Sequence, residues 1–153
     1  MVQFVLPNDA NTLGNVLGGM VLHWIDLAAA VVALRHCRTA AVTASIDQVS
    51  FLAPIKVGQV ALISARMTYA GRTSMEIRVD VESENLQTGV RQQTSTAYLT
   101  FVAIDKKGQP IPVPPLRLET NEERREGGAA VARRTARLKA RTAPPPTRET
   151  TIR

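Results

Sequence analysis

Apolar residues occupy almost every position between residues 20 and 36, so a helix over this segment would be apolar on nearly every side. A helix that is apolar all round is normally buried, and we therefore expect a long buried helix here. Its 17 residues would extend about 26 Å at 1.5 Å per residue. Gly18 and Gly19 come directly before it and mark its start, while Arg35 and His36 suit its C-terminal end, where the helix dipole favours cations.

Segments that favour β-structure lie on both sides of this helix. They are a short apolar run at 2–6 and four longer segments at 41–52, 59–69, 74–84 and 91–104. Within 74–84, apolar side chains alternate with charged ones, which predicts a strand with one face in the core and one in water. Because the connections are short, neighbouring strands should be antiparallel. We therefore predict an α+β fold, with one long central helix wrapped by a curled antiparallel sheet of about five strands.

The composition changes after residue 118. Residues 110–115 are Pro-rich and should form an extended exit from the folded domain, and the chain beyond them is mostly Glu, Arg, Ala, Gly and Pro. Residues 1–116 hold nine Lys/Arg and eight Asp/Glu, a net +1, whereas residues 117–153 hold ten and five, a net +5. We predict a domain over 1–118 and a basic, largely disordered or partly helical tail over 119–153, with helical propensity at 129–141. Nucleic acid is not an expected partner, because the folded part is nearly neutral.

Other features of the composition limit the class of protein. Cys37 is the only cysteine, so no intramolecular disulfide can form, which fits a reducing compartment. Two His and one Cys offer no metal-site spacing, so we expect no metal. The longest apolar run is shorter than the roughly 20 residues that a membrane span needs, and the N-terminus lacks the pattern of a signal peptide. These features predict a cytoplasmic protein that does not insert into a membrane.

One carboxylate, Asp26, interrupts the apolar run, and an ionised Asp in apolar surroundings is costly without a partner. It is either a catalytic group or a structural one bonded to the backbone, Arg35 or His36. Gly18 and Gly19 at the helix start would expose backbone N–H groups suited to a carbonyl oxygen that gains negative charge. Asn15, in the preceding loop, could hold a water or donate to that oxygen, or could merely cap the helix.

The chain resembles the hotdog-fold acyl-CoA thioesterases of the cytosolic acyl-CoA hydrolase type over roughly residues 5–115. The resemblance rests on these segments, in this order: Pro7-Asn-Asp-Ala-Asn-Thr-Leu-Gly-Asn15-Val-Leu-Gly-Gly19, Trp24-Ile-Asp26, Leu34-Arg-His-Cys37, Val42-Thr-Ala-Ser45, Phe51-Leu-Ala-Pro-Ile-Lys-Val-Gly58, Gly71-Arg-Thr-Ser-Met-Glu76 and Phe101-Val-Ala-Ile-Asp105. One departure is Leu17, where some members carry a polar residue, and it bears on substrate preference rather than on the reaction.

The resemblance implies hydrolysis of an acyl-CoA to a free fatty acid and CoA, with coenzyme A thioester as the substrate and no further cofactor. It implies that Asn15 and Asp26 are the catalytic positions, as general base or nucleophile in the case of Asp26. It also implies a homodimer whose sheets join edge to edge, assembled further into a hexamer as a trimer of dimers. The turn of Gly71, Arg72, Thr73 and Ser74 offers a guanidinium and two hydroxyls for the CoA phosphates or pantetheine, although an ordinary hairpin turn would have the same composition.

Helix geometry gives a separate reason to expect a dimer. Asp26 lies seven residues beyond Gly19, so the two Cα atoms should be about 10 Å apart along one helix. A thioester carbonyl must lie about 3 Å from its donors and close to its base. Two antiparallel copies of the helix would satisfy both conditions, with Asn15 and Gly19 of one chain facing Asp26 of the other. We therefore expect a composite site at a homodimer interface.

Two other functions are compatible with the sequence. The first is a non-catalytic acyl-CoA-binding regulatory hotdog protein that uses its basic tail on nucleic acid or a membrane surface. The second is a hotdog hydratase, which would need an Asp–His pair. His23 is three residues before Asp26 and shares its helix face. Release of CoA, as against hydration of an enoyl-CoA, distinguishes these functions.

Overall fold

The computed structural model describes residues 1–47 and 49–142 and divides into two compact units, Met1–Arg117 and Leu118–Arg153. The first unit contains β1 (Val2–Phe4), the short 3-10 helix η1 (Pro7–Asp9), α1 (Gly18–Cys37), β2 (Ala40–Ile46), β3 (Val60–Ala70), β4 (Ser74–Glu84) and β5 (Arg91–Ile104). The second contains α2 (Asn121–Thr142), so the helix expected at 129–141 begins earlier. The rest of the predicted tail, 143–153, lies outside the described residues.

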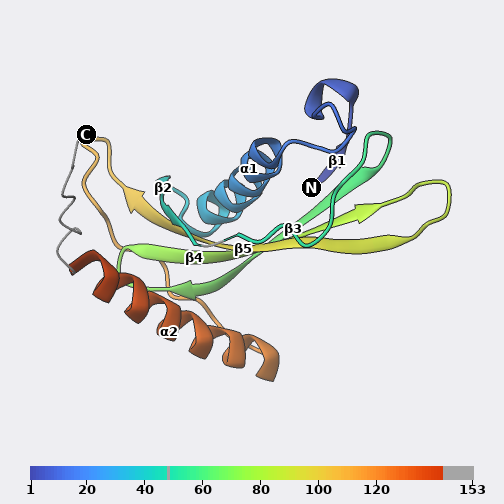
Figure 1. The fold of residues 1–153 in the computed structure, drawn as a ribbon. Helices are drawn as coiled ribbons and strands as arrows, with labels where there is room; N and C mark the ends of the chain where they lie inside the picture. The colour runs from blue at the N-terminus through green and yellow to red at the C-terminus, as the bar shows by residue number, and fades with distance from the viewer. Residues whose placement is uncertain (48, 143–153) are drawn as a thin grey trace, which may run out of the picture. The chain divides into compact units, whose positions relative to one another are not determined.

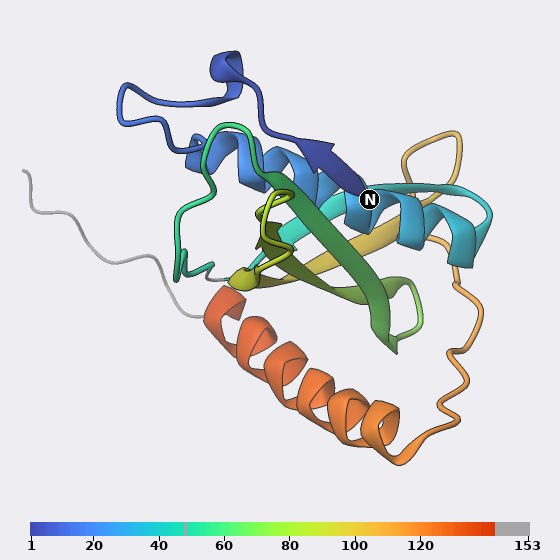
Figure 2. The same cartoon turned by 90° about the vertical axis from the view of Figure 1, so that its right-hand side faces the viewer.

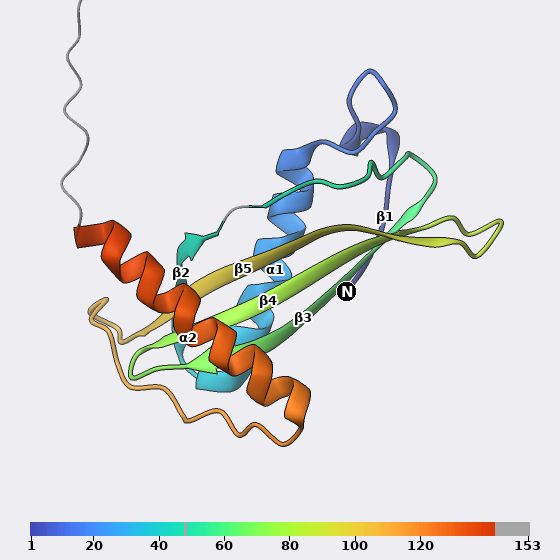
Figure 3. The same ribbon diagram turned by 60° about the horizontal axis from the view of Figure 1, so that its bottom comes forward.

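The five strands form one antiparallel sheet in the order β1-β3-β4-β5-β2, and α1 lies along one face of it (Figure 1). Register shifts interrupt the β2–β5, β3–β4 and β4–β5 pairings, and such bulges bend a strand and increase its twist. Figure 3 shows α1 crossing β3, β4 and β5. The prediction of one long helix against a curled, five-stranded antiparallel sheet is confirmed.

The core lies between α1 and the sheet. The alternating residues of β4 supply its centre, because Met75, Ile77, Val79 and Val81 are all fully buried. β5 adds Ala97, Leu99 and Phe101 in the same way. The helix contributes large residues near its start and small ones further along, and its buried positions are Val21, Trp24, Ile25, Ala28, Ala29, Ala33 and Cys37. Small side chains let the helix backbone approach the sheet closely, which suits a curled sheet.

The opposite face of the sheet is less wet than the pattern in 74–84 predicted. Glu76 is buried and accepts a hydrogen bond from the Thr68 hydroxyl (2.8 Å). Asp80 forms ion pairs with Arg66 (3.0 Å) and Arg78 (2.9 Å). Partial burial raises the pKa of the Asp80 carboxyl, but the hydrogen bonds from Arg78 and Thr96 and the positive charge of Arg78 outweigh it, so the net pKa is lowered. Charged groups of the sheet are therefore paired rather than simply solvated.

The expectation that α1 is buried on every side is wrong. Leu27, Val31 and Leu34 are 44–47% exposed and form one stripe along the helix, at the i, i+4, i+7 spacing of a single face. The sheet of one chain covers the other side only. By length and composition alone α1 could also cross a membrane, but the core helix of a fold passes the same test, and this helix supplies seven buried residues to the core.

The strand predicted at 41–52 is also shorter than expected, because β2 ends at Ile46. Gln48 lies outside the described residues, and 49–59 forms a loop to β3. This loop returns towards the N-terminal segment, where the N–H of Val16 donates to the carbonyl of Ile55 (2.8 Å). Figure 2 shows the two loops side by side at the N-terminal end of α1. Residues 49–59 therefore contact the N-terminal segment instead of extending β2, and the hydrophobic pattern of this segment does not predict such contacts.

Candidate active site

Asp26 lies in the middle of α1, partly buried at the border of its exposed stripe. The hydroxyl of Thr43 donates a hydrogen bond of 2.7 Å to Asp26 Oδ1. Thr43 belongs to β2, the strand at one edge of the sheet, so the edge strand holds the carboxylate in place. Within the described residues, Asp26 Oδ2 makes no hydrogen bond and is available to a water or a substrate.

This arrangement differs from the surroundings expected for Asp26. The carboxylate is not enclosed by apolar groups, because the Thr43 hydroxyl and solvent both reach it. Neither helix-end alternative applies within the described residues: His36 Nε2 lies 2.8 Å from the carbonyl of Pro114, and Arg35 forms no ion pair with Asp26. Thr43 was missed in the sequence because a Thr inside a β-branched run is an ordinary strand residue. Only the packing of β2 beside α1 reveals the pair.

Gly18 and Gly19 are the first two residues of α1, and both are exposed. Leu17, at the N-cap, offers no side-chain cap, and its carbonyl accepts from the N–H groups of Met20 (2.9 Å) and Val21 (3.2 Å). Within the described residues, the N–H groups of the two glycines make no hydrogen bond. A Cβ on Gly19 would meet nothing within 4 Å, so a ligand can approach this backbone. These free donors at the positive end of a helix can stabilise an oxyanion.

The loop before α1 carries two asparagines that have different environments. Asn11 Oδ1 accepts from the N–H groups of Leu13 (2.9 Å) and Asn15 (3.2 Å), while its Nδ2 makes no hydrogen bond within the described residues. Gly14, with a φ of 74°, allows the tight turn between them. The Asn15 side chain makes no hydrogen bond in the same part of the chain. Asn11 therefore shapes the loop and keeps one donor free, and Asn15 keeps its whole amide free.

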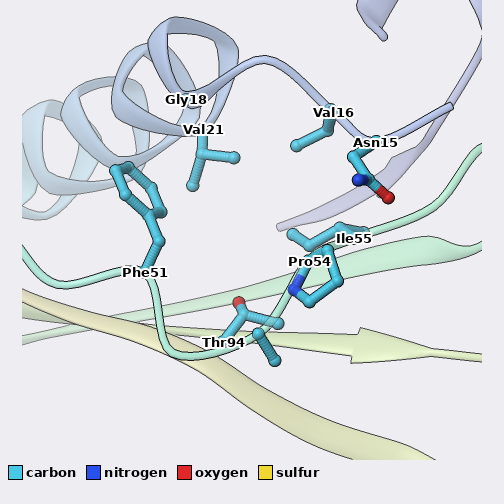
Figure 4. Close-up of a pocket in the computed structure, with 9 residues that line it drawn as sticks. Asn15, Val16, Gly18, Val21, Phe51, Pro54, Ile55 and Thr94 are labelled. Atoms are coloured by element: carbon cyan, nitrogen blue, oxygen red, sulfur yellow. The ribbon is translucent and has the colours of Figure 1, made fainter. Parts of the chain in front are cut away.

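A pocket of about 170 Å³ lies beside the N-terminal end of α1 (Figure 4). It is lined by Asn15, Val16, Gly18, Val21, Phe51, Ala53, Pro54, Ile55 and Thr94. These residues come from the loop before α1, the first turns of α1, the β2–β3 loop and β5. The structure thus brings two of the predicted site positions, Asn15 and Gly18, to one apolar pocket.

The turn of Gly71, Arg72, Thr73 and Ser74 joins β3 to β4, as expected. The N–H of Gly71 donates to the carbonyl of Ser74 (2.8 Å), and Arg72 is exposed. The turn lies at the far end of the sheet from the pocket, because Ser74 pairs with Val102, eight residues along β5 from Thr94, or about 26 Å. Within one chain, the structure therefore separates this turn from the pocket.

Asp26 is also separated from the helix start in one chain. α1 is continuous from Gly18 to Cys37, so Asp26 stays about 10 Å along the axis from Gly19. No group of three or more His, Cys, Asp or Glu able to hold a metal occurs among the described residues. One chain therefore presents three separate parts: the Asp26–Thr43 pair, the glycine donors with the pocket, and the β3–β4 turn.

Comparison with known proteins identifies the family. The model of the Thioesterase superfamily matches residues 13–90. An uncharacterised acyl-CoA thioester hydrolase of Bacillus subtilis, YkhA, is 44% identical over 119 residues, covering 78% of this chain and 69% of that protein. The cytosolic acyl coenzyme A thioester hydrolase of Rattus norvegicus is 36% identical over 151 residues, or 95% of this chain. The chain spans only 40% of the length of the rat protein.

Solved structures with the same fold as this chain are also named as acyl-CoA thioesterases or hydrolases. An acyl-CoA thioesterase solved as an apo hexamer matches with a TM-score of 0.89 and 44% identity, covering 94% of this chain and 92% of that one. The acyl-CoA hydrolase of Staphylococcus aureus, in complex with butyryl coenzyme A, coenzyme A and coenzyme A disulfide, matches with a TM-score of 0.83 and 36% identity over 92% and 85% of the two chains.

The Staphylococcus aureus hydrolase has also been solved as three single alanine variants, of an aspartate, a threonine and an asparagine, the last in complex with coenzyme A. In that protein the aspartate lies fifteen residues after the asparagine, and the threonine lies seventeen residues after the aspartate. The family match covers half of this chain, and the relatives exceed 30% identity over most of it. The chain therefore belongs to the thioesterase superfamily, and its curled sheet and long helix are the hotdog fold of that family.

Proposed function

We propose that this protein is an acyl-CoA thioesterase, which hydrolyses an acyl-CoA to a free fatty acid and CoA. The observation that carries the proposal is the Asp26–Thr43 pair, a carboxylate oriented by a 2.7 Å hydrogen bond at the border between the exposed stripe of α1 and the edge strand β2. Relatives and structural neighbours named as acyl-CoA thioester hydrolases support the same reaction. As in the cytosolic relatives, we propose that the enzyme acts in the cytoplasm.

The free N–H groups of Gly18 and Gly19 bind the thioester oxygen as it gains charge. In one route Asp26 accepts a proton from a water whose oxygen attacks the carbonyl carbon. The C–S bond then breaks, and the proton passes to the CoA thiolate. In the other route an Asp26 oxygen attacks the carbonyl carbon, the C–S bond breaks and CoA leaves as the thiolate. Water then hydrolyses the mixed anhydride to the free acid and the Asp26 carboxylate, and its released proton passes to the thiolate. Thr43 acts as a positioning residue in both routes, because it holds one carboxylate oxygen and leaves the other free.

The site is composite and needs two copies of the chain. Asp26 and Gly19 lie about 10 Å apart along one helix, too far for one thioester carbonyl to meet both. The apolar stripe of α1 and the edge strand β2, where Ile46 is 42% exposed, form one uncovered surface beside Asp26. A two-fold partner that pairs β2 with β2 and packs α1 against α1 buries this surface. Three such dimers would make a hexamer, and a neighbouring acyl-CoA thioesterase is hexameric.

The spacing in the Staphylococcus aureus hydrolase bears on which asparagine takes part. Fifteen residues separate Asn11 from Asp26, and seventeen separate Asp26 from Thr43, the same spacings as those of the varied positions in that protein. This adds Thr43 to the proposed site and favours Asn11 over Asn15 as the amide donor. Asn11 is also the more rigid of the two, since its oxygen is held by two backbone N–H groups. Asn15 then contributes to the pocket beside the carbonyl.

The turn of Gly71, Arg72, Thr73 and Ser74 completes the site from the partner. In an antiparallel arrangement of the two α1 helices, the far end of one sheet comes beside the N-terminal end of the other helix. The exposed guanidinium of Arg72 then meets a CoA phosphate, and Thr73 and Ser74 offer hydroxyls. Within one chain the turn lies about 26 Å from the pocket, whereas the partner's turn would lie beside it.

A complementation assay tests the composite site. Asp26→Ala and Asn11→Ala homodimers should each release thiol from acyl-CoA about 1,000-fold more slowly than wild type, because each lacks one group in both sites. Mixed by unfolding and refolding at equal amounts, half of the dimers are heterodimers with one intact site, so activity should recover to about a quarter of wild type. Asn15→Ala, the matched loop variant, decides which asparagine is needed.

Each failure in this assay has a distinct meaning. No recovery on mixing, with dimers intact by light scattering, would show that each chain holds its own site. Asp26→Ala activity within about tenfold of wild type would reject the role of the carboxylate. Wild-type protein that binds acyl-CoA without releasing CoA would be the regulatory binding protein instead, and hydration of an enoyl-CoA without CoA release would identify a hydratase.

A further inference from the structure

The pocket beside α1 has an almost wholly apolar lining. Only Asn15 and Thr94, of its lining residues, carry polar side-chain atoms. The hydroxyl of Thr94 already donates to the carbonyl of Val81 (2.9 Å). The free amide of Asn15 is therefore the one side-chain polar group that this lining offers to a ligand. An apolar pocket with a single polar group suits a ligand that is an alkyl chain ending in a carbonyl.

Most of the pocket wall is fixed by backbone hydrogen bonds. The N–H of Leu52 donates to the carbonyl of Thr94 (2.8 Å), which attaches the β2–β3 loop to β5. At the other end of the same segment, the carbonyl of Ile55 accepts from the N–H of Val16 (2.8 Å). The side chains of Val21 and Ile55 are buried behind these bonds. The wall between Leu52 and Ile55 is therefore held at both ends and forms a preformed surface.

Phe51 is the exception in this wall. It precedes the segment fixed by these bonds, its backbone makes no hydrogen bond within the described residues, and its side chain is 51% exposed. Figure 4 shows its ring directed towards the first turn of α1, beside Gly18 and Val21. Two ring carbons lie 3.5 Å from where a Cβ on Gly18 would stand. The ring therefore lies within van der Waals reach of the start of α1. Because the Phe51 backbone makes no hydrogen bond within the described residues, the whole residue can move without breaking one.

We propose that this pocket binds the acyl chain of the substrate and that the Phe51 ring limits the length of the chain. This inference rests on the proposed function, since it assigns the acyl part of the same substrate. Volume sets the expected length: a protein cavity of about 150 Å³ holds one benzene, so about 170 Å³ holds an unbranched chain of about six carbons. A longer chain must displace the ring. Phe51 is thus a specificity-determining residue.

Binding of non-hydrolysable alkyl-CoA thioethers with 2 to 16 carbons tests this without relying on turnover. For wild-type protein, calorimetry should show the Kd falling about fourfold per added methylene up to about six carbons and then levelling or rising. Phe51→Ala should move this break to chains longer by several carbons, and Phe51→Trp should move it to shorter ones. Leu52→Ala is the matched control, because Leu52 is the next residue, is 73% exposed and does not line the pocket.

A break at the same chain length in wild type, Phe51→Ala and Phe51→Trp would overturn the inference, and so would an equal shift in Leu52→Ala. Thiol release from acyl-CoAs of the same lengths separates this inference from the proposed function. If the affinity pattern follows Phe51 but no acyl-CoA is hydrolysed, the acyl pocket stands and the thioesterase proposal fails. If acyl-CoAs are hydrolysed with a length profile that substitutions of Phe51 do not change, the thioesterase proposal stands and the acyl-pocket inference fails.

Discussion

The two faces of α1 are alike in sequence and opposite in environment. The face towards the sheet carries residues such as Val21, Ala29 and Ala33, which are at most 2% exposed. The other face carries Leu27, Val31 and Leu34, which are 44–47% exposed although they are no less apolar. A hydrophobic pattern indicates that burial of a residue is favourable, but it does not indicate which surface will bury it. Here one face is covered by the chain's own sheet, and the other stays exposed to solvent in the single chain.

The sizes of the residues sharpen this comparison. On the sheet-facing side, the alanines at 28, 29 and 33 allow close contact with a curved sheet beside the larger Trp24 and Ile25, whereas the Leu and Val side chains of the outer stripe form ridges that suit packing against another helix. Asp26 lies where these two faces meet and is held by the neighbouring strand β2. The candidate catalytic group is therefore placed at the boundary between the core of one chain and the surface proposed for its partner. Under this proposal, activity and assembly depend on the same residues.

Two matched substitutions, one on each face of α1, should have the largest effects on folding and activity. They test directly whether the two faces have different roles. Ala29→Asp places a charge in the core without a partner, and we expect it to abolish folding, seen as loss of far-ultraviolet circular dichroism. Val31→Asp places the same charge two residues later, on the exposed stripe, and should leave the fold intact. Like charges facing each other across an interface cost several kcal/mol, so dimerisation and thiol release should each fall by roughly 100-fold or more.

Light scattering and thiol release at several protein concentrations measure the second effect, and Lys106→Asp, on an exposed residue in the turn after β5, is a charge control. A Val31→Asp protein that stays dimeric and active would show that the stripe is an ordinary solvent-exposed surface. The proposed composite site would then lose its structural basis.

Substitutions of Thr43 should have an intermediate effect and test whether the boundary positions the carboxylate. Removing a hydrogen bond to a charged group costs about 1.5–3 kcal/mol, so Thr43→Ala should lower kcat by roughly 10- to 100-fold. KM should change little, because Thr43 acts on Asp26 rather than on the substrate. Thr43→Ser keeps the hydroxyl and should recover most of the activity. Equal losses in Thr43→Ala and Thr43→Ser would indicate a packing role for the methyl group instead.

Much of the fold could be read from the sequence because its patterns are local. The limits of β4 and β5 and the buried positions of both strands follow from simple alternation, and α1 follows from its long, mostly apolar run. The end of β2 could not be predicted this way. Residues 49–52 are as apolar as a strand, but they leave the sheet: Phe51 lines the pocket beside α1, and Val49 packs against the core. Their apolar character therefore serves contacts other than a strand pairing.

The candidate site was less accessible to the same reasoning. Asp26 stands out as one carboxylate in an apolar run, and the glycine pair marks the helix start. Thr43 does not stand out, because its role depends on a strand packing beside a helix seventeen residues away. Asn11 and Asn15 lie in one turn-rich loop, and local patterns do not rank them. The spacing of the varied positions in a related protein favours Asn11 in the proposed site, and residue types alone carry no such information.

Ser95 and Thr94, neighbours in β5, give the smallest expected effect and test the sheet-facing side of the comparison. Ser95 lies on the inward face of the strand, and its hydroxyl is buried without a hydrogen-bond partner in the described part of the chain. Because an unsatisfied buried hydroxyl costs about 1–3 kcal/mol, Ser95→Ala should raise the free energy of unfolding by about 1 kcal/mol. Thr94→Val is the matched control and should lower it by about 1 kcal/mol, since the Thr94 hydroxyl donates to Val81.

Urea unfolding at one fixed protein concentration measures both changes, since the stability of an oligomer depends on concentration. If Ser95→Ala destabilises the protein as much as Thr94→Val does, the Ser95 hydroxyl has a partner such as a buried water, and the inner face of the sheet is not fully apolar. If the two variants move in opposite directions, this face behaves as a dry core. Burial against an apolar surface would then be favourable for both faces of α1, and the two faces would differ only in which surface covers them.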